Sequence, residues 1–262
     1  MIRFLRHTLL FGLTGLLLTG CFETTEELTI NENGSGTYSM AMDFSQLFQM
    51  FDAMGASDSS AQSALPKARQ DTTVNFRSFT DTAKALTTEQ KALFRDAQLH
   101  LVMDEKEKEF KMNISMPYSK PGDVTKLMQL LSSENGGSVL GNMMKGNNAL
   151  GGQAPSDGKT GLPDINSSFD LTVGRNSVAR KLNKQKHDSV MQQYNGQFGD
   201  ESMGSEMLAA IKFHTVIHLP RAVKKVTATK PIVSADKKTV TINGTLVDLF
   251  KNPQVFSYTI DY

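Results

Sequence analysis

The sequence predicts an α+β fold, in which hairpins build an antiparallel β-sheet and a few short helices pack on it. Long stretches alternate between apolar and polar residues with a period of two, which is typical of strands with one buried face. Between them lie segments whose apolar residues recur every three or four positions, as in amphipathic helices. The two kinds of segment are mixed irregularly, which does not match the strand–helix–strand rhythm of a parallel sheet.

Two hairpins are predicted in the first half of the chain. Leu28–Ile30 alternates before the turn-forming residues 32–36, where glycines tolerate positive φ, and alternation resumes over Tyr38–Phe44. Leu99–Met103 and Phe110–Met116 alternate on either side of a charged tip. Each of these strands offers one apolar face to a core.

The last third of the chain repeats this pattern. Phe169–Val173 precedes a turn at 174–176 and a return strand that starts at Val178. Further alternating segments are expected at Ile211–Leu219, Val223–Val226, Val240–Ile242 and Phe256–Tyr262. The final segment is therefore expected to lie inside a sheet.

Helices are predicted between the strands from apolar spacing and N-terminal capping residues. Thr87 and Gln90 fit a capping box, in which each side chain bonds the other residue's backbone. The predicted helices cover Leu47–Met54 after Ser45, Thr88–Ala97, Val124–Leu131 after Asp123, Val190–Tyr194 and Met207–Ile211.

One stretch differs from the rest in composition. Residues 132–162 hold eight of the 20 glycines together with four asparagines and no sustained periodicity, so we expect a long flexible Gly/Asn-rich loop there. A second loop is expected from Gly55 to Gln70. The remainder is expected to form one α+β domain over residues 21–262.

The N-terminal residues predict a lipoprotein signal peptide over residues 1–20. Arg3 and Arg6 precede an uncharged apolar run, Thr8–Leu18, which is too short to span a bilayer as a helix. The run ends in Leu18-Thr19-Gly20-Cys21, which resembles the bacterial lipobox. That resemblance implies cleavage before Cys21, lipidation of its thiol and acylation, for example by palmitate, of its new amino group. Glu23, Glu26 and Glu27 are then expected to lie in a solvated tether.

Composition and motifs argue against several classes of function. A net charge of +1 without a basic block argues against nucleic acid as a partner, and the single cysteine excludes a disulfide framework. No nucleotide-binding or hydrolase motif is found, so we expect no enzyme, no cofactor and no metal site. A Ser–His–Asp triad assembled only in space would escape this search.

The candidate polar clusters are all interpreted as solvated surface. His214 and His218 have the i, i+4 spacing of a helical metal site, but their Thr, Val and Ile neighbours favour a strand, which would hold them roughly 13 Å apart. Glu26-Glu27, Arg180-Lys181 and His187 lie in polar runs without local signs of burial.

The segment Thr215–Tyr262 and the hairpin Leu28–Phe44 are similar to LppM-like envelope lipoproteins in their strand-and-turn pattern. The resemblance implies an α+β envelope domain with lipid binding and carries over no functional residues. We therefore expect a lipid-anchored envelope protein on the periplasmic face or the cell surface. Its expected role is non-enzymatic, as an interaction or structural protein. The alternative is a module that binds a lipid or another apolar ligand, because the 14 methionines suit an adaptable apolar cavity.

Overall fold

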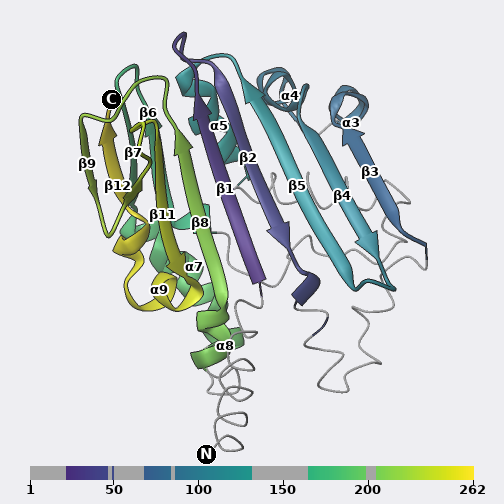
Figure 1. Ribbon diagram of the computed structural model, residues 1–262. Coiled ribbons are helices and arrows are strands. Elements are labelled where there is room, and N and C mark those ends of the chain that lie inside the picture. The colour runs from purple at the N-terminus through teal and green to yellow at the C-terminus, as the bar shows by residue number, and fades with distance from the viewer. Residues whose placement is uncertain (1–21, 47–48, 50–67, 84–85, 132–164, 199–204) are drawn as a thin grey trace, which may run out of the picture.

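The fold is α+β, with two β-sheets and several short helices (Figure 1). The computed structural model describes residues 22–46, 49, 68–83, 86–131, 165–198 and 205–262. The predicted loop 132–162 and most of the predicted helix 47–54 lie outside these residues, as does most of the loop 55–70.

The larger sheet has eight strands, and the smaller sheet has four. In spatial order the larger sheet consists of β10 (Ile232–Val233), β11 (Thr239–Thr245), β8 (Ile211–His218), β1 (Phe22–Ile30), β2 (Gly36–Asp43), β5 (Glu109–Tyr118), β4 (Gln98–Asp104) and β3 (Gln70–Asn75). The smaller sheet consists of β6 (Phe169–Val173), β7 (Ser177–Leu182), β12 (Tyr258–Asp261) and β9 (Lys225–Ala228).

The prediction of a purely antiparallel sheet is wrong at one pair of strands. β1 runs parallel to β8, with Phe22 opposite Ile211 and Thr29 opposite His218. Alternation shows that a strand has one buried face, but it identifies neither the partner nor the direction of a distant strand. Every other pairing within the two sheets is antiparallel, including both predicted hairpins, β1–β2 and β4–β5.

The first hairpin turn requires glycine at two positions. Gly34 has a φ of +83°, in the left-handed region that favours glycine. At Gly36, a Cβ would lie 1.8 Å from the Thr29 carbonyl oxygen and 2.4 Å from the Tyr118 hydroxyl. That hydroxyl donates a 2.8 Å hydrogen bond to the same carbonyl. Because glycine has no side chain, Tyr118 of β5 can approach and bond the hairpin at this point.

Short helices and 3₁₀ turns connect the strands. They are α3 (Arg77–Thr82), α4 (Thr88–Phe94), α5 (Pro121–Leu131), η3 (Ile165–Ser168), α7 (Lys184–Phe198), α8 (Ser205–Ala210), α9 (Leu246–Lys251) and η4 (Pro253–Phe256). The predicted capping box is present at α4, where Thr87 and Gln90 bond each other's backbone. Strand β3 and helices α3 and α9 were not predicted, and α9 begins at an unpredicted capping box of Thr245 and Asp248.

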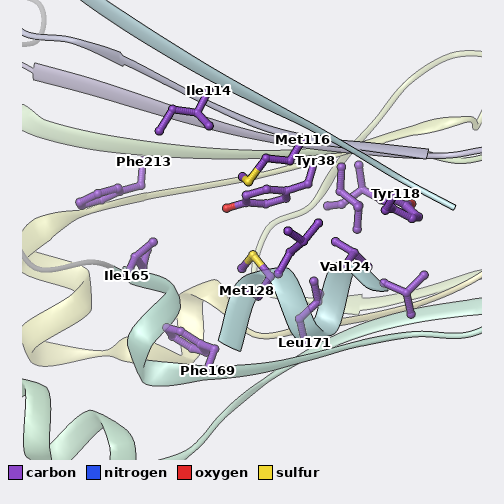
Figure 2. Close-up of a cluster of buried hydrophobic side chains, with 14 of the residues drawn as sticks. Tyr38, Ile114, Met116, Tyr118, Val124, Met128, Ile165, Phe169, Leu171 and Phe213 are labelled. Atoms are coloured by element: carbon purple, nitrogen blue, oxygen red, sulfur yellow. The ribbon is translucent and has the colours of Figure 1, made fainter. Parts of the chain in front are cut away.

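The core fills the space between the larger sheet and the layer formed by α5 and the smaller sheet. In Figure 1 α5 lies behind the larger sheet, and the smaller sheet extends to the left, with β12 and β9 beyond β11. Figure 2 shows Tyr38 and Met116 from the larger sheet facing Val124 and Met128 of α5, with Phe169 and Leu171 of β6 below. The apolar residues of β1, β5 and β8 that alternate in the sequence are buried in this core, as predicted.

Candidate functional site

The predicted lipidation site lies at the edge of the described chain. Cys21 and the predicted signal peptide 1–20 are outside the described residues, and β1 begins at Phe22, which is buried. The prediction of a solvated tether at Glu23–Glu27 is therefore wrong, because these residues form the centre of a sheet. Polar residues that are interspersed with apolar ones occur both in a solvated tether and in a half-buried strand, so the sequence pattern alone does not distinguish the two.

A group of polar side chains is buried where the two sheets face each other. We call it the Arg180 cluster; it consists of Glu26 of β1, Tyr38 of β2, Asn166 of η3, Arg180 of β7 and Thr215 of β8. The parallel register sets Glu26 directly opposite Thr215, so both side chains point to the inner face. Arg180 reaches them from the facing sheet because it shares the inner face of β7 with Val178.

Hydrogen bonds connect all five members of the cluster. The Arg180 guanidinium donates to Glu26 Oε2 at 2.7 Å and to Thr215 Oγ1 at 3.3 Å through Nη1. Nη2 donates to Asn166 Oδ1 at 2.8 Å, and the Asn166 amide donates to the Tyr38 hydroxyl at 3.0 Å. The Thr215 hydroxyl also donates to Glu26 Oε2, at 3.2 Å. The cluster thus joins the two sheets by directed bonds.

The charges within the cluster compensate each other. Arg180 is 1% exposed and Glu26 is 6% exposed, so neither charge is solvated by bulk water. Burial, the largest single influence, lowers the pKa of the Arg180 guanidinium, but Glu26, Tyr258 and Tyr38 together outweigh it and raise this pKa. Burial also raises the pKa of the neighbouring Tyr258 hydroxyl, which keeps it neutral. The guanidinium carbon lies 4.8 Å from the centre of the Phe169 ring, a cation–π contact.

Three residues interpreted as solvated surface are therefore buried. Glu26 and Arg180 form the ion pair just described, and His187 is 8% exposed. His187 Nδ1 lies 3.2 Å from Ser168 Oγ, and burial lowers the pKa of this imidazole. The burial of Glu26 could have been predicted from its place in the alternating pattern. It lies on the same face of the strand as Phe22 and Leu28, where an apolar residue is expected.

A cavity of about 710 Å³ adjoins the cluster. Its walls come from α5, η3, β6, β7 and the first half of α7. Apolar side chains cover one part of its lining and polar side chains the rest; the apolar ones are Met128, Phe169, Leu171 and Val190, and the polar ones include Thr125, Gln129, Asn166, Asn183 and Ser189. This volume lies within the range of sites for small organic ligands, and the lining is more polar than in most such sites.

Arg180 is part of the cavity lining, and one of its donors has no partner. Its Nε is one of two buried side-chain polar atoms in the described part of the chain that make no hydrogen bond; the other is Ser257 Oγ, outside the cavity lining. An unpaired buried donor costs about 1–3 kcal/mol, and more when it carries charge. Nε has almost no accessible surface, so this donor lies inside the packed wall and does not face the cavity.

The histidines of β8 lie on a strand, as predicted. His214 Nδ1 is 2.8 Å from Asn243 Oδ1, and His218 Nδ1 is 3.3 Å from Thr239 Oγ1, both within the larger sheet. Within the described ranges, no group of three or more His, Cys, Asp or Glu side chains is placed to hold a metal. The Ser168–His187 pair does not line the cavity.

None of the helices in the described part of the chain has both the length and the apolar character needed to cross a bilayer.

No protein-family model matches the chain, and no curated protein matches it. Among solved structures, the chain is similar to the folded domain of the LppM protein of Mycobacterium tuberculosis, determined by NMR. The sequences are 8% identical, the TM-score is 0.36, and the alignment covers 94% of this chain and 92% of that one.

Proposed function

We propose that this protein is a lipid-anchored bacterial envelope protein whose folded body binds an amphiphilic ligand without chemical conversion. The observation that carries the ligand-binding part is the cavity of about 710 Å³ between α5, β6, β7 and α7. Its lining combines apolar side chains for a hydrocarbon portion with polar side chains for a head portion. The cavity supports the ligand-binding alternative of the sequence analysis over a purely structural role.

The anchoring part of the proposal rests on the residues around Cys21. The apolar run Thr8–Leu18 and the sequence Leu18-Thr19-Gly20-Cys21 support cleavage and lipidation at this cysteine. Because β1 starts at the next residue, a lipid on Cys21 would hold the larger sheet directly at the membrane surface. Two or more acyl chains would make this attachment stable.

The anchor can be tested by metabolic labelling with an alkyne fatty acid in a bacterial host. We expect the full chain to carry the label and to sediment with membranes, and Cys21→Ala to lose both properties. Labelling that survives the substitution would contradict lipidation at Cys21.

Ligand binding can be tested by mass spectrometry of the full chain extracted from its own envelope. We expect an organic molecule to leave the protein on denaturation. Val190→Trp adds bulk to the half-buried cavity wall, so we expect it to reduce this recovery severalfold. Val216→Trp is the matched control, because Val216 is half-buried on the outer face of β8. Equal recovery from both variants would contradict binding in the cavity.

A second candidate function, binding of an envelope protein partner, is supported by the outer face of the larger sheet. Among the described elements, no helix lies in front of this face in Figure 1. It carries a hollow of about 330 Å³ lined by residues that include Glu23, Asp43, His100 and Lys111. A photo-crosslinking residue at Asn113 should trap a partner protein in vivo if this face is used, whereas the same residue at Val190 should not.

A further inference from the structure

We propose that a cationic surface around strand β10 docks an acidic segment of a partner protein. We call this surface the basic edge; it spans residues 221–238, and its cations are Arg221, Lys224, Lys225, Lys230, Lys237 and Lys238. The same stretch contains one acidic residue, Asp236. The basic edge contributes no residue to the lining of the ligand cavity, so this inference goes beyond the proposed function.

Backbone hydrogen bonds bring the two cationic stretches of the basic edge together. The amide of Leu219 donates to the Lys238 carbonyl, and the amide of Val223 donates to the Lys237 carbonyl, both at 2.8 Å. The chain that leads into β9 therefore lies beside the turn that connects β10 with β11. Cations from both stretches are thus gathered on one surface.

Four lysines of the basic edge have no carboxylate partner in the described part of the chain. They are exposed and belong to none of the ion pairs found there: Lys225, Lys230, Lys237 and Lys238. On other surfaces, Lys111, Lys126 and Lys186 each pair with a carboxylate. The basic edge therefore concentrates unpaired positive charge, which attracts acidic groups.

The acidic residues nearby do not offset this charge. Asp236 accepts hydrogen bonds from the Ser234 hydroxyl and the Lys238 amide, so its carboxylate stabilises the turn between β10 and β11. Asp261 is opposite Lys225 in the pairing of β9 with β12, yet the two side chains form no ion pair. Even with both carboxylates counted, cations remain in excess.

Two of these lysines have a backbone conformation that favours other residues. Lys230 has a φ of +48° and Lys237 a φ of +58°, in the left-handed region. Glycine or asparagine would be less strained at both positions. Lysine is thus present at the expense of local stability, which is typical of positions that serve a function.

Exposed apolar side chains lie between the lysines and favour a protein as the partner. Ile232 is 58% exposed and Val233 is 40% exposed, and no other large apolar side chain in the described residues is as open to solvent. Both belong to β10, the edge strand of the larger sheet. Lysines at a sheet edge discourage pairing with uncharged strands. An acidic segment with apolar residues would be attracted by the lysines and could contact Ile232.

The position of the basic edge argues against the anchoring membrane as its partner. β1 starts at Phe22, beside the proposed anchor, and Thr29 is opposite His218, which is paired with Thr239 at the start of β11. At about 3.3 Å per residue, the strand from Phe22 to Thr29 spans roughly 23 Å. In Figure 1 β11 starts at the opposite end of the sheet from the start of β1. With the proposed anchor, the basic edge is held away from the membrane surface.

The test uses the full chain in nanodiscs of phosphatidylcholine, which has no net charge. The probe is a fluorescein-labelled peptide of alternating Glu and Val, and fluorescence anisotropy measures its Kd. We expect binding that weakens as salt is raised, because salt screens exposed charges. The same peptide with Gln in place of Glu should bind at least about tenfold more weakly, since it lacks the ion pairs. No binding of the acidic peptide, or equal binding of both peptides, would overturn the proposal.

Replacing the two left-handed lysines isolates the charge from the fold. Lys230→Asn with Lys237→Asn removes two cations, and asparagine tolerates a positive φ, so the thermal midpoint should stay equal or rise. We expect the Kd of the acidic peptide to increase about fivefold, as two exposed ion pairs imply. The matched control is Lys106→Asn with Lys108→Asn in the turn between β4 and β5, where Lys108 also has a positive φ of +52°. An equal effect of both double variants would mean that only net charge matters and would overturn the proposal.

Two further measurements identify the kind of partner. Ile232→Ser should increase the Kd of the acidic peptide about threefold by removing an apolar contact. An unchanged Kd would overturn the contact with β10. Vesicles of phosphatidylglycerol should displace the labelled peptide less effectively than unlabelled peptide of equal accessible charge. More effective displacement by the vesicles would assign the basic edge to an anionic membrane and overturn the protein partner. None of these outcomes affects the proposed ligand cavity, which Val190→Trp tests separately.

Discussion

Two regions of the core differ in whether polar side chains are buried among the apolar ones. Beneath β2 and β5, the larger sheet packs on α5 through apolar side chains such as Met116, Val124 and Leu127. Beneath β1 and β8, apolar side chains such as Phe213, Ile217 and Val178 also pack together, but here the Arg180 cluster adds directed bonds to β7. Non-directional burial tolerates small shifts of α5, whereas the ion pair and its hydrogen bonds define one position of β7 against β1. The difference suggests that the cavity, which adjoins both halves, is positioned by the polar half.

The largest expected effect comes from removing one member of the ion pair. Arg180→Met should destabilise the protein by about 3–5 kcal/mol, because it leaves the Glu26 carboxylate buried without its partner. Replacing both residues, as Glu26→Leu with Arg180→Met, should recover most of that loss. Urea unfolding of both variants measures this, and a double variant as unstable as the sum of the single losses would contradict the comparison.

The apolar half should respond with a smaller and additive loss. Leu127→Ala removes a fully buried side chain of α5 and should cost about 3 kcal/mol. Combined with Arg180→Met, it should add its full cost, because Leu127 is not a member of the Arg180 cluster. Strong coupling between these variants in urea unfolding would show that the halves act as one unit.

Tyr38 connects the halves and should give an intermediate result. Its ring lies in the apolar half beside Met116, while its hydroxyl accepts the bond from Asn166. Tyr38→Phe keeps the ring and should cost about 1 kcal/mol through the lost hydrogen bond. An unchanged midpoint of thermal unfolding would mean that the hydrogen bond between Asn166 and Tyr38 does not contribute to the stability of the protein.

His187 should make the smallest contribution, visible as a dependence on pH. Burial lowers its pKa in the folded protein, so the unfolded chain binds a proton first as the pH falls below about 6.5. The free energy of unfolding should therefore decrease as the pH falls below that value. Asp188 partly opposes the lowering of the His187 pKa, and Lys184 adds to it. His187→Gln should flatten this dependence between pH 7 and pH 5, measured by urea unfolding at each pH.

The apolar faces of the strands could be predicted from the sequence, whereas the Arg180 cluster could not. Alternation identified the apolar faces of β2, β4, β5 and β8 and the last three residues of β1, because each of these patterns lies within one short segment. The Arg180 cluster contains residues that lie far apart in the sequence: Glu26 and Thr215 are separated by 189 positions. No local sequence pattern indicates that such residues are in contact. Strand β3 was missed because its polar residues alternate with Thr72 and Val74, an edge pattern with little apolar content.

The parallel pairing of β1 and β8 also constrains the order of events during synthesis. β1 can pair with β2 as soon as the turn at Gly34 emerges, but its other edge has no partner until residues 211–218 exist. A free strand edge is a template for pairing with other chains. Glu26 points inward from that edge, and burying it against any strand without Arg180 would be costly. The carboxylate that joins the sheets in the folded protein thus also discourages a growing chain from pairing with its neighbours.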